Sequence, residues 1–317
     1  MAPGRAEVVE LPDPHPDPGE VVVKVMAVTT CPQWDLHLMH GEPMFAGAAL
    51  AYPYTPGQPG HEMSGVIAAV GRDVDTFKPG DRVVAWRDPG HQRQGCYAEQ
   101  VRFQPEDLLA IPGDGPFASY APFELAMCVG ASFVDVLGTT SLRGKRVGVA
   151  GLGPAGLLAA QFAKAEGASE VIGFETEPGR GEAARSFGVD RSVDPRAVPA
   201  GESFRGRFGH LDVSIDCVGS KAAAEYLLRI TGEIVAIFGV QREDYAYPAG
   251  SNKLFGYPGH TRKAADYAMA KVSAGLVRLD PLIGARMGLD DYLKAVSLLE
   301  KREVLKVCFL PHGEHGT

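Results

Sequence analysis

The sequence predicts an α/β protein with two domains, one β-rich and barrel-like, the other built on a doubly wound parallel sheet. Three observations lead to this prediction. A chain of 317 residues is long enough for two domains of ordinary size. Up to about residue 120, short strand patterns are joined by Gly/Pro turns. From about residue 121, strand and helix patterns alternate, which is typical of a parallel sheet covered by helices.

The first part has strand patterns only. Its apolar and polar residues alternate over short runs that Gly and Pro interrupt, as in an all-β barrel. A proline-spaced loop is expected over residues 11–19 and a Lys-Pro-Gly-Asp turn over residues 78–81. Strands are expected over residues 20–28, 66–70, 82–86 and 95–101.

The second part alternates between two periodicities. Short buried runs rich in Val and Ile predict strands, and longer runs with helical spacing predict the helices between them. The tail adds one more helix and a last strand. Strands are expected over residues 146–150, 170–174, 211–217, 233–238 and 305–309, and helices over residues 155–166, 178–187, 221–229 and 289–300.

Composition and charge argue against several classes of protein. A hydrophobic content of 45% and a charged content of 22% are those of a soluble globular protein. The net charge of −8, with no basic block, argues against nucleic-acid binding. No uninterrupted apolar run reaches 18 residues, and the N-terminus lacks the apolar core of a secretory signal. Five scattered cysteines without a Cys-x-x-Cys pair favour a reducing, cytoplasmic location.

A glycine-rich motif opens the second part. Gly151, Gly153, Pro154, Ala155 and Gly156 lie in a Gly-x-Gly-x-x-Gly pattern between a predicted strand and a predicted helix. The first glycine allows a tight turn, the second lets the backbone approach a pyrophosphate, and the third allows close packing of helix on strand. Proline suits the first helical position, where its missing N–H is not needed. The motif therefore predicts a dinucleotide site at the helix N-terminus.

The next strand is expected to end at an acidic residue. Glu175 follows Gly156 by 19 residues, the position at which a carboxylate accepts hydrogen bonds from a ribose 2′-OH and repels a 2′-phosphate. This favours NAD over NADP. Arg180 is close enough in sequence to contact the adenosine phosphate, and a solvated strand-end charge is the alternative for Glu175.

Two further strand ends are expected to border the cofactor. The carboxyl ends of parallel strands meet at one edge of a sheet, so residues after neighbouring strands line the same crevice. The residues expected to line the path from adenosine to nicotinamide are Cys217, Val218, Phe238, Gly239 and Val240.

The most informative stretch lies in the first part. Residues Gly60–Gly65, Gly-His-Glu-Met-Ser-Gly, followed by Gly71 and Val74, fill every defined position of the zinc-type alcohol dehydrogenase signature. The His61 imidazole and the Glu62 carboxylate are groups that coordinate zinc, and the two later glycines let a strand turn tightly behind them. With a cysteine upstream and the dinucleotide motif downstream, the chain resembles the zinc-dependent medium-chain dehydrogenase/reductase superfamily over nearly its full length.

The resemblance implies both architecture and activity. Residues 1–128 and 277–317 are expected to form a GroES-like β-barrel catalytic domain, and residues 129–276 a Rossmann NAD(P)-binding domain. The implied activity is hydride transfer between a secondary alcohol and NAD(P), dependent on zinc. The partners implied are a small alcohol or carbonyl substrate and a further copy or copies of the chain, as a homodimer or homotetramer.

By resemblance, Cys31 and His61 are the first two zinc ligands, with one position left for water or substrate, and Glu62 stands behind the metal or binds it transiently. The segment after Cys31 departs from the family. Relatives usually have a hydroxyl two residues on and a histidine five residues on, whereas this chain has Gln33 and His37, so one residue is inserted. Asp35 and His37 are the replacement candidates for the proton relay. A helix-capping aspartate and a surface histidine are the alternatives.

The third zinc ligand is left open between two residues. Relatives place a cysteine or glutamate before the first Rossmann strand, and this chain has both Glu124 and Cys128 there. Glu124 is favoured, because a charge in so apolar a run needs a partner and because a glutamate is typical of the polyol dehydrogenase-like branch. In that case Cys128, one helical turn away, faces the nicotinamide.

Two other family features bear on cofactors. Many relatives hold a second, structural zinc with four closely spaced cysteines, but the corresponding residues 84–96 contain only Cys96, so a single zinc is expected. Lys306 resembles the basic residue that reaches the pyrophosphate, with a plain surface lysine as the alternative.

The implied mechanism is that an alcohol releases a proton towards Asp35 or His37 and a hydride to nicotinamide C4, while zinc polarises the alcohol oxygen. The glutamate-type ligand favours polyols, sugars or cyclitols. Two rivals remain, a zinc-free quinone or enoyl reductase of the same superfamily and a catalytically silent nucleotide-binding sensor or structural protein.

Overall fold

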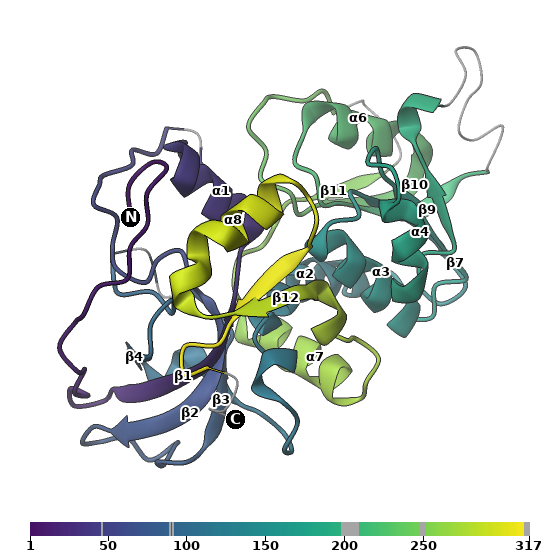
Figure 1. Cartoon of the computed structure of the whole chain (residues 1–317). Coiled ribbons are helices and arrows are strands. Elements are labelled where there is room, and N and C mark those ends of the chain that lie inside the picture. Colours follow the sequence, from purple (N-terminus) through teal and green to yellow (C-terminus); the bar gives the residue numbers. More distant parts are fainter. Residues whose placement is uncertain (46, 89, 91, 198–208, 248–251, 314–317) are drawn as a thin grey trace. The chain divides into compact units, whose positions relative to one another are not determined.

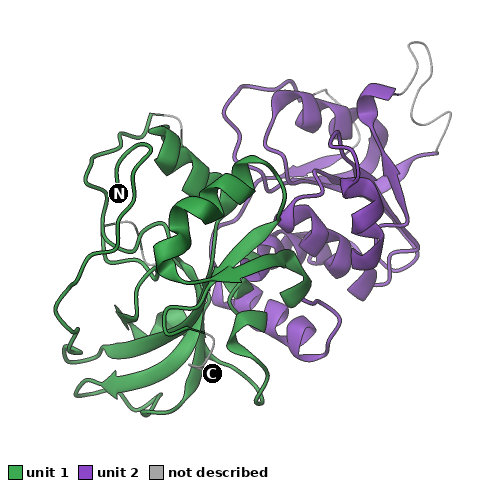
Figure 2. Cartoon of the chain, viewed as in Figure 1, with its two compact units in different colours: residues 1–125, 279–317 green, residues 126–278 purple. Residues whose placement is uncertain are grey.

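The computed structural model describes the chain except for residues 46, 89, 91, 198–208, 248–251 and 314–317 (Figure 1). The described residues divide into two compact units, residues 1–125 with 279–317 and residues 126–278 (Figure 2). The sequence places the two boundaries after residues 128 and 276. One unit is built on an antiparallel-rich sheet and the other on a parallel sheet, so the predicted fold class is confirmed.

The first unit is organised around β1 (Val21–Thr29), which pairs with β2, β4 and β13. Its sequence, VVVKVMAVT, is rich in β-branched residues, and only Lys24 is exposed, because other parts of the unit pack on both faces of the strand. The pairing of β1 with β2 contains two register shifts, and such bulges increase the twist that curls a sheet. The sheet order is β12-β13-β1-β2-β3-β5. The other elements are β2 (Glu62–Val70), β3 (Arg82–Ala85), β4 (Gln100–Phe103), β5 (Leu108–Ala110), β12 (Ile283–Met287), β13 (Lys306–Phe309), α1 (Pro32–His40) and α8 (Tyr292–Glu300).

The glycines of the signature serve close backbone contacts. Gly65 lies in β2 opposite Val25, and a Cβ there would overlap the carbonyl oxygen of Lys24. A Cβ at Gly71 would likewise overlap the carbonyl oxygen of Asp17. Any larger residue would push β2 away from its neighbours, so the spacing of these glycines fixes how tightly the strand behind His61 is held.

The second unit is a doubly wound sheet. Its six strands are all parallel, in the order β11-β10-β9-β6-β7-β8, so the chain starts at β6, moves outward to β8 and then returns to continue from β9 on the other side. The strand order reverses between β6 and β9, and ligands bind at this point in open α/β sheets. The elements are β6 (Arg146–Ala150), β7 (Glu170–Phe174), β8 (Arg191–Val193), β9 (Leu211–Asp216), β10 (Thr231–Ile237), β11 (Lys253–Phe255), α3 (Pro154–Ala165), α4 (Arg180–Ala183), α6 (Lys221–Ile230) and α7 (Arg262–Ser273), and α2 (Phe123–Leu137) enters this unit from the first.

Several predicted elements differ in extent. The strand expected over residues 66–70 begins earlier, as β2, Glu62–Val70, and the helix expected over residues 289–300 opens as a 3-10 turn, Leu289–Asp291, before α8. The strand expected over residues 95–101 is only β4, Gln100–Phe103, because the backbone of residues 95–97 instead bonds to the loop at residues 56–60. The helix expected over residues 178–187 is one turn, α4, followed by a 3-10 turn at Ala184–Phe187. Gly179, with φ of 83°, and Gly181 leave this segment little helical preference.

The residues of 117–137 are apolar and numerous enough to cross a membrane on length and composition alone, with a mean hydropathy of 1.4. They include the charged residues Glu124 and Asp135, so the run is not uninterrupted. About 72% of its most apolar 18-residue window is buried, which is the pattern of a core helix.

Candidate metal centre and nucleotide site

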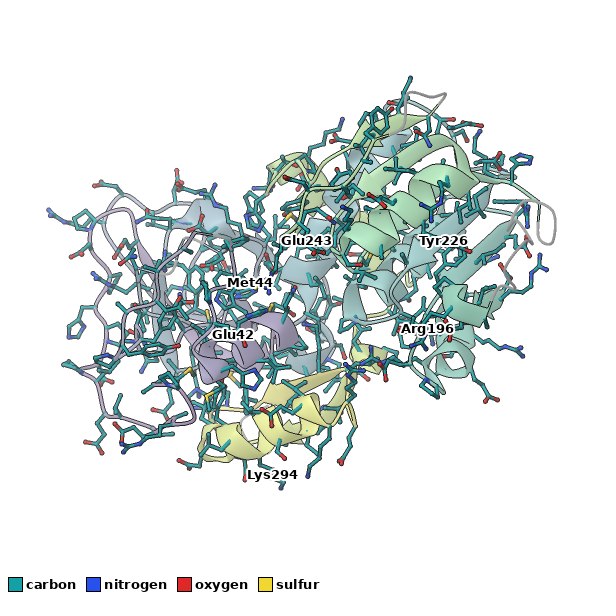
Figure 3. The ribbon with its side chains drawn as sticks, turned by 90° about the horizontal axis from the view of Figure 1, so that it is seen from above. Glu42, Met44, Arg196, Tyr226, Glu243 and Lys294 are labelled. Atoms are coloured by element: carbon teal, nitrogen blue, oxygen red, sulfur yellow. The ribbon has the colours of Figure 1, made fainter. Side chains whose placement is uncertain are left out.

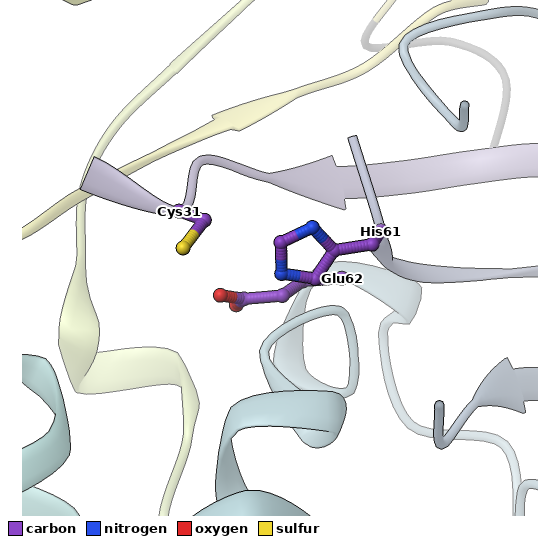
Figure 4. Close-up of side chains that lie close together, drawn as sticks. All are labelled: Cys31, His61 and Glu62. Carbon is purple, nitrogen blue, oxygen red and sulfur yellow. The ribbon is translucent and has the colours of Figure 1, made fainter. Parts of the chain in front are cut away.

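Three predicted ligands converge in the first unit. Cys31 follows β1 and occupies the N-cap position of α1, while His61 directly precedes β2 and Glu62 is the first residue of β2. The antiparallel register pairs Thr29 with Glu62, so the end of β1 meets the beginning of β2. The ligand atoms of the three residues all lie within 4.8 Å of one another (Figure 4). A sulfur, an imidazole and a carboxylate gathered in this way fit zinc.

Backbone geometry orients the His61 ring. Its Nδ1 lies 2.7 Å from the carbonyl oxygen of Pro59, which can only accept a hydrogen bond, so Nδ1 carries the proton. In the neutral ring the lone pair is then on Nε2, the atom that a metal would use in place of a proton. Nε2 lies 3.6 Å from Oε2 of Glu124. The ring is therefore held in the tautomer that a zinc ligand needs.

The electrostatics of this pocket favour a cation. Burial lowers the pKa of His61, but a hydrogen bond with Cys31 and the negative charges of Glu124, Cys31 and Glu62 raise the pKa well above its usual value. A site that stabilises a protonated imidazole so strongly stabilises positive charge at that point. A bound metal ion would meet the same anionic neighbours.

A buried lysine neutralises Glu62. The Lys306 ammonium is fully buried and lies 2.6 and 2.7 Å from the two oxygens of Glu62 and 2.7 Å from the carbonyl oxygen of Thr30. Thr29 donates a further hydrogen bond of 2.8 Å to Glu62. Burial raises the pKa of Glu62, and Lys306 acts in the opposite direction. This pairing keeps the carboxylate compensated without a metal, which suits a residue standing behind the zinc.

Lys306 is fully buried, so the alternative of a plain surface lysine is wrong. A lysine ammonium has three N–H donors, and all three have acceptors inside the first unit. In this arrangement no donor is left for the pyrophosphate contact that the family resemblance implies. The sequence gives no sign of this pairing, because Lys306 and Glu62 are far apart along the chain.

The two candidates for the third ligand fall in different units. Glu124, in the first turn of α2, is buried and faces Nε2 of His61. Cys128 belongs to the second unit, where the Tyr257 hydroxyl donates a hydrogen bond of 3.1 Å to its sulfur. The distance from Glu124 to His61 supports the glutamate.

The two relay candidates both lie on α1. Asp35 is fully buried, and the hydroxyls of Tyr97 and Tyr292 donate hydrogen bonds of 2.9 and 2.7 Å to its carboxylate. Because Cys31 occupies the cap position, the helix-capping alternative for Asp35 is wrong. His37, in the last turn, has a side chain only 13% exposed and lies 3.4 Å from Glu42, so it is not a plain surface histidine.

Replacing Asp35 by Asn should change the pH dependence of stability. Burial raises the pKa of Asp35 from 3.8 to about 6, against the lowering effect of its tyrosine hydrogen bonds. The folded state thus binds this proton more tightly than the unfolded state, so Asp35 makes the free energy of unfolding fall as pH rises from about 4 to 6, by at most about 1.4 kcal/mol per unit. Urea unfolding at several pH values should show Asp35→Asn gaining on wild type across this window and then levelling off. If the free energy of unfolding of the two proteins changed with pH in the same way, Asp35 would not have a raised pKa.

The nucleotide motif of the second unit has the expected geometry. Gly151 has φ of 80°, a conformation that favours glycine, and α3 begins at Pro154. A Cβ at Gly156 would overlap the carbonyl oxygen of Gly151, so the third glycine is required for the helix to pack against the turn. The N-terminus of α3 is thereby aimed at the edge where β6 ends.

Glu175 also organises the glycine-rich turn. Its carboxylate accepts hydrogen bonds from the backbone N–H groups of Leu152 at 2.9 Å, Thr176 at 2.7 Å and Glu177 at 2.9 Å. Arg180 lies 3.9 Å from the same carboxylate. The side chain of Glu175 is only 7% exposed, so the solvated-charge alternative is wrong.

The sequence did not single out Asp216, which ties two strand-end loops together. Its buried carboxylate accepts hydrogen bonds from the N–H of Val218 at 2.9 Å and from the Gln241 amide at 2.9 Å. Burial raises its pKa, and these bonds act against the rise. A Cβ at Gly239 would overlap Gly219, so the loops after β9 and β10 are in close contact. An aspartate ending a buried strand just before a Val-Gly turn was the available signal. The predicted lining residues Cys217, Val218, Phe238, Gly239 and Val240 all lie in these two loops.

The fold and the ligand cluster together define a zinc-dependent dehydrogenase. Residues 17–132 match the family of the alcohol dehydrogenase GroES-like domain, and residues 154–250 match the zinc-binding dehydrogenase family. An alcohol dehydrogenase of Rhizobium meliloti is 30% identical over 258 residues, covering 73% of this chain and 72% of that protein. The chain therefore belongs to the zinc-dependent medium-chain dehydrogenase/reductase superfamily and is an alcohol dehydrogenase-like oxidoreductase.

Other relatives span nearly the whole chain. A sorbitol dehydrogenase of Halalkalibacterium halodurans is 27% identical, covering 97% of this chain and 96% of its own. Among solved structures, galactitol-1-phosphate dehydrogenase from Escherichia coli has a TM-score of 0.80 at 24% identity, covering 98% of each chain. A structure from Sinorhizobium meliloti bound to NADP has a TM-score of 0.78 at 25% identity, covering 97% of this chain and 96% of its own. The zinc-binding dehydrogenase family and the NADP-bound structure thus support zinc and a nicotinamide cofactor for this chain.

Proposed function

We propose that this enzyme interconverts a secondary alcohol of the polyol, sugar or cyclitol kind and its ketone, using one zinc ion and preferring NAD to NADP. The observation that carries the proposal is the buried group of Cys31, His61 and Glu62, with Glu124 facing the free nitrogen of His61. The names of relatives agree with it, since they include a sorbitol dehydrogenase and a butanediol dehydrogenase.

The residues fit one zinc ion. Cys31, His61 and Glu124 are the ligands we assign, and Glu62 stands behind them because Lys306 already compensates its charge. When bound, zinc polarises the alcohol oxygen and lowers its pKa. Only Cys96 is available where relatives carry four cysteines, so we assign no structural zinc.

The chain itself must receive the proton that the alcohol loses. Gln33 cannot do so, because an amide does not ionise in the working pH range. Asp35 is the better candidate of the two on α1. It is buried, two tyrosine hydroxyls hold its carboxylate, and its pKa of about 6 suits proton exchange near neutrality. His37 stands beside Glu42 and is the second candidate.

Metal analysis and an NAD-linked substrate screen test the proposal. The purified chain should carry about one zinc and reduce NAD in the presence of a secondary alcohol or polyol. A chain that holds no zinc but reduces quinones or enones would be the zinc-free reductase. A chain that binds cofactor and turns over nothing would be the catalytically silent sensor. Size measurement in solution should give a homodimer or homotetramer, and we expect the enzyme in the cytoplasm.

Glu175→Ala should weaken NAD binding more than NADP binding. The carboxylate is proposed to hold the ribose hydroxyls, and a hydrogen bond to a charged group contributes about 1.5–3 kcal/mol, roughly a ten- to hundredfold change in affinity. Because Glu175 also bonds to the N–H of Leu152, its loss should loosen the glycine-rich turn for both cofactors. The readout is therefore the ratio of the two dissociation constants, measured by titration. Glu175→Gln, which keeps an acceptor for Leu152, is the matched control. An unchanged ratio in Glu175→Ala would refute the NAD preference.

A further inference from the structure

Two aromatic side chains, Trp34 and Phe45, lie beside the metal ligand His61. Trp34, on α1, lies with its ring centroid 5.6 Å from that of His61, at an interplanar angle of 59°. Phe45 meets Trp34 edge-on, with centroids 6.0 Å apart and planes at 85°. Phe45 lies in the loop after α1, directly after Met44, and Met44 is labelled in Figure 3. The two rings therefore meet nearly at right angles, and Phe45 is 48% exposed.

The polar N–H of the Trp34 indole is already used in a hydrogen bond. A hydrogen bond between the side chains of Trp34 and Tyr54 lowers the pKa of the tyrosine, against burial, which raises it. The indole N–H is the only donor of a tryptophan side chain, so this bond uses its polar atom and fixes the ring. What Trp34 can offer to a bound molecule is a flat aromatic face with no hydrogen-bonding group.

Three other aromatic residues of the first unit do not share this exposure. Trp86, Phe117 and Phe123 are all buried. The Trp86 indole donates a hydrogen bond of 2.7 Å to the carbonyl oxygen of Glu106. The guanidinium of Arg82 covers Phe117 at 4.1 Å. These three side chains are parts of the core, whereas Trp34 is only partly buried and contacts a metal ligand.

We propose that Trp34, with Phe45 beside it, selects cyclic secondary alcohols, binding one face of a six-membered ring; this rests on the proposed function. In such a ring with equatorial hydroxyls, axial C–H bonds cover both faces and the hydroxyls project from the rim. The ring face can therefore pack on the indole while the rim keeps its hydrogen bonds. A linear polyol cannot bury an equal area on Trp34 without also burying hydroxyls that find no partner there. The residue inserted between Cys31 and His37 lengthens the segment that carries this tryptophan.

The kinetic test compares ring and non-ring alcohols. Cyclohexanol and myo-inositol serve as ring probes, and 2-propanol and sorbitol as references. Trp34→Ala should lower the ratio of kcat/KM for the ring alcohols to kcat/KM for 2-propanol by roughly ten- to hundredfold, mainly through KM of the ring alcohols. Trp34→Phe should keep most of the preference, and Phe45→Ala should lose part of it. Zinc content is measured for each variant.

A binding test needs no turnover. The chain has two tryptophans, so Trp86→Phe leaves Trp34 as its only one. Ring alcohols should then change the tryptophan fluorescence in a saturable way with zinc present and NAD omitted, so that no NADH forms. Trp34→Phe, which retains Trp86, should show no such change and is the matched control.

The outcomes separate this inference from the proposed function. If the wild type carries zinc and binds NAD but oxidises none of the four alcohols, the proposed function fails. If it oxidises sorbitol or 2-propanol without favouring rings, the proposed function stands and the role of Trp34 is overturned. An equal loss for 2-propanol and ring alcohols in Trp34→Ala would show that the indole only supports His61. If Trp34→Ala does not fold, Trp34→Phe, Phe45→Ala and the fluorescence titration decide.

Discussion

Cys31→Ala and His61→Ala are each expected to abolish turnover while leaving NAD binding nearly unchanged. Both side chains belong to the group whose ligand atoms lie within 4.8 Å of one another, in the first unit, whereas the glycine-rich turn belongs to the second. A zinc site that loses one of three protein ligands loses most of its affinity for the metal. Zinc content and turnover should therefore fall together, and the dissociation constant of NAD should stay within a few-fold of the wild-type value.

A control is needed because any cysteine substitution can disturb the fold. Cys96 is buried in the core of the same unit and is not a member of the ligand group, so Cys96→Ala should cost some stability but retain zinc and activity. Zinc retained at wild-type level in Cys31→Ala, or equal zinc loss in Cys96→Ala, would contradict the assignment of Cys31.

A comparison of the Glu124→Gln and Cys128→Ala variants should identify the third zinc ligand. The Glu124→Gln substitution keeps the size of the side chain but removes the negative charge that faces Nε2 of His61 at 3.6 Å. If Glu124 coordinates zinc, its variant should lose metal and turnover together, while Cys128→Ala keeps its zinc. The reverse result would place the enzyme in the cysteine-ligand branch and weaken the case for polyhydroxylated substrates.

The sequence predicts best where local pattern and backbone geometry decide the structure. The Gly-x-Gly-x-x-Gly motif required a strand, a tight turn and a helix, and β6, Gly151 and α3 provide them. The parallel sheet follows from the alternation of strands and helices, which needs no knowledge of distant contacts. By contrast, no helix was predicted over residues 32–40, where the structure has α1. Pro32 in fact occupies the first turn, where its missing N–H costs nothing.

Contacts between distant residues account for what the sequence left open. Asp35 resembled a capping residue because aspartates commonly cap helices, but Tyr97 and Tyr292, far along the chain, bury it and bind its carboxylate. Residues 95–97 had a strand-like sequence, yet their backbone bonds to the loop at residues 56–60. Local periodicity cannot identify the tyrosines that bind Asp35 or the loop that binds residues 95–97, because only the fold brings these segments together.

Lys306→Met is expected to destabilise the first unit by about 3–5 kcal/mol, the usual cost of removing one partner from a buried ion pair. Lys306 is fully buried, and its ammonium is the compensating charge for a Glu62 carboxylate that is only 1% exposed. Methionine has a similar length and no charge, so the variant isolates the loss of charge from the loss of packing. Chemical denaturation at neutral pH measures the effect.

The double variant Glu62→Gln/Lys306→Met separates charge imbalance from altered shape. With no carboxylate left unpaired, it should recover much of the stability that Lys306→Met loses, and the coupling between the two substitutions should exceed about 1 kcal/mol. The loss in Lys306→Met should also shrink at low pH. Burial already raises the pKa of Glu62 and Lys306 lowers it, so removing the lysine raises it further and lets the carboxyl protonate more easily in the folded state. Equal destabilisation at all pH values, with no recovery in the double variant, would show that Lys306 acts through packing and not as the charge partner of Glu62.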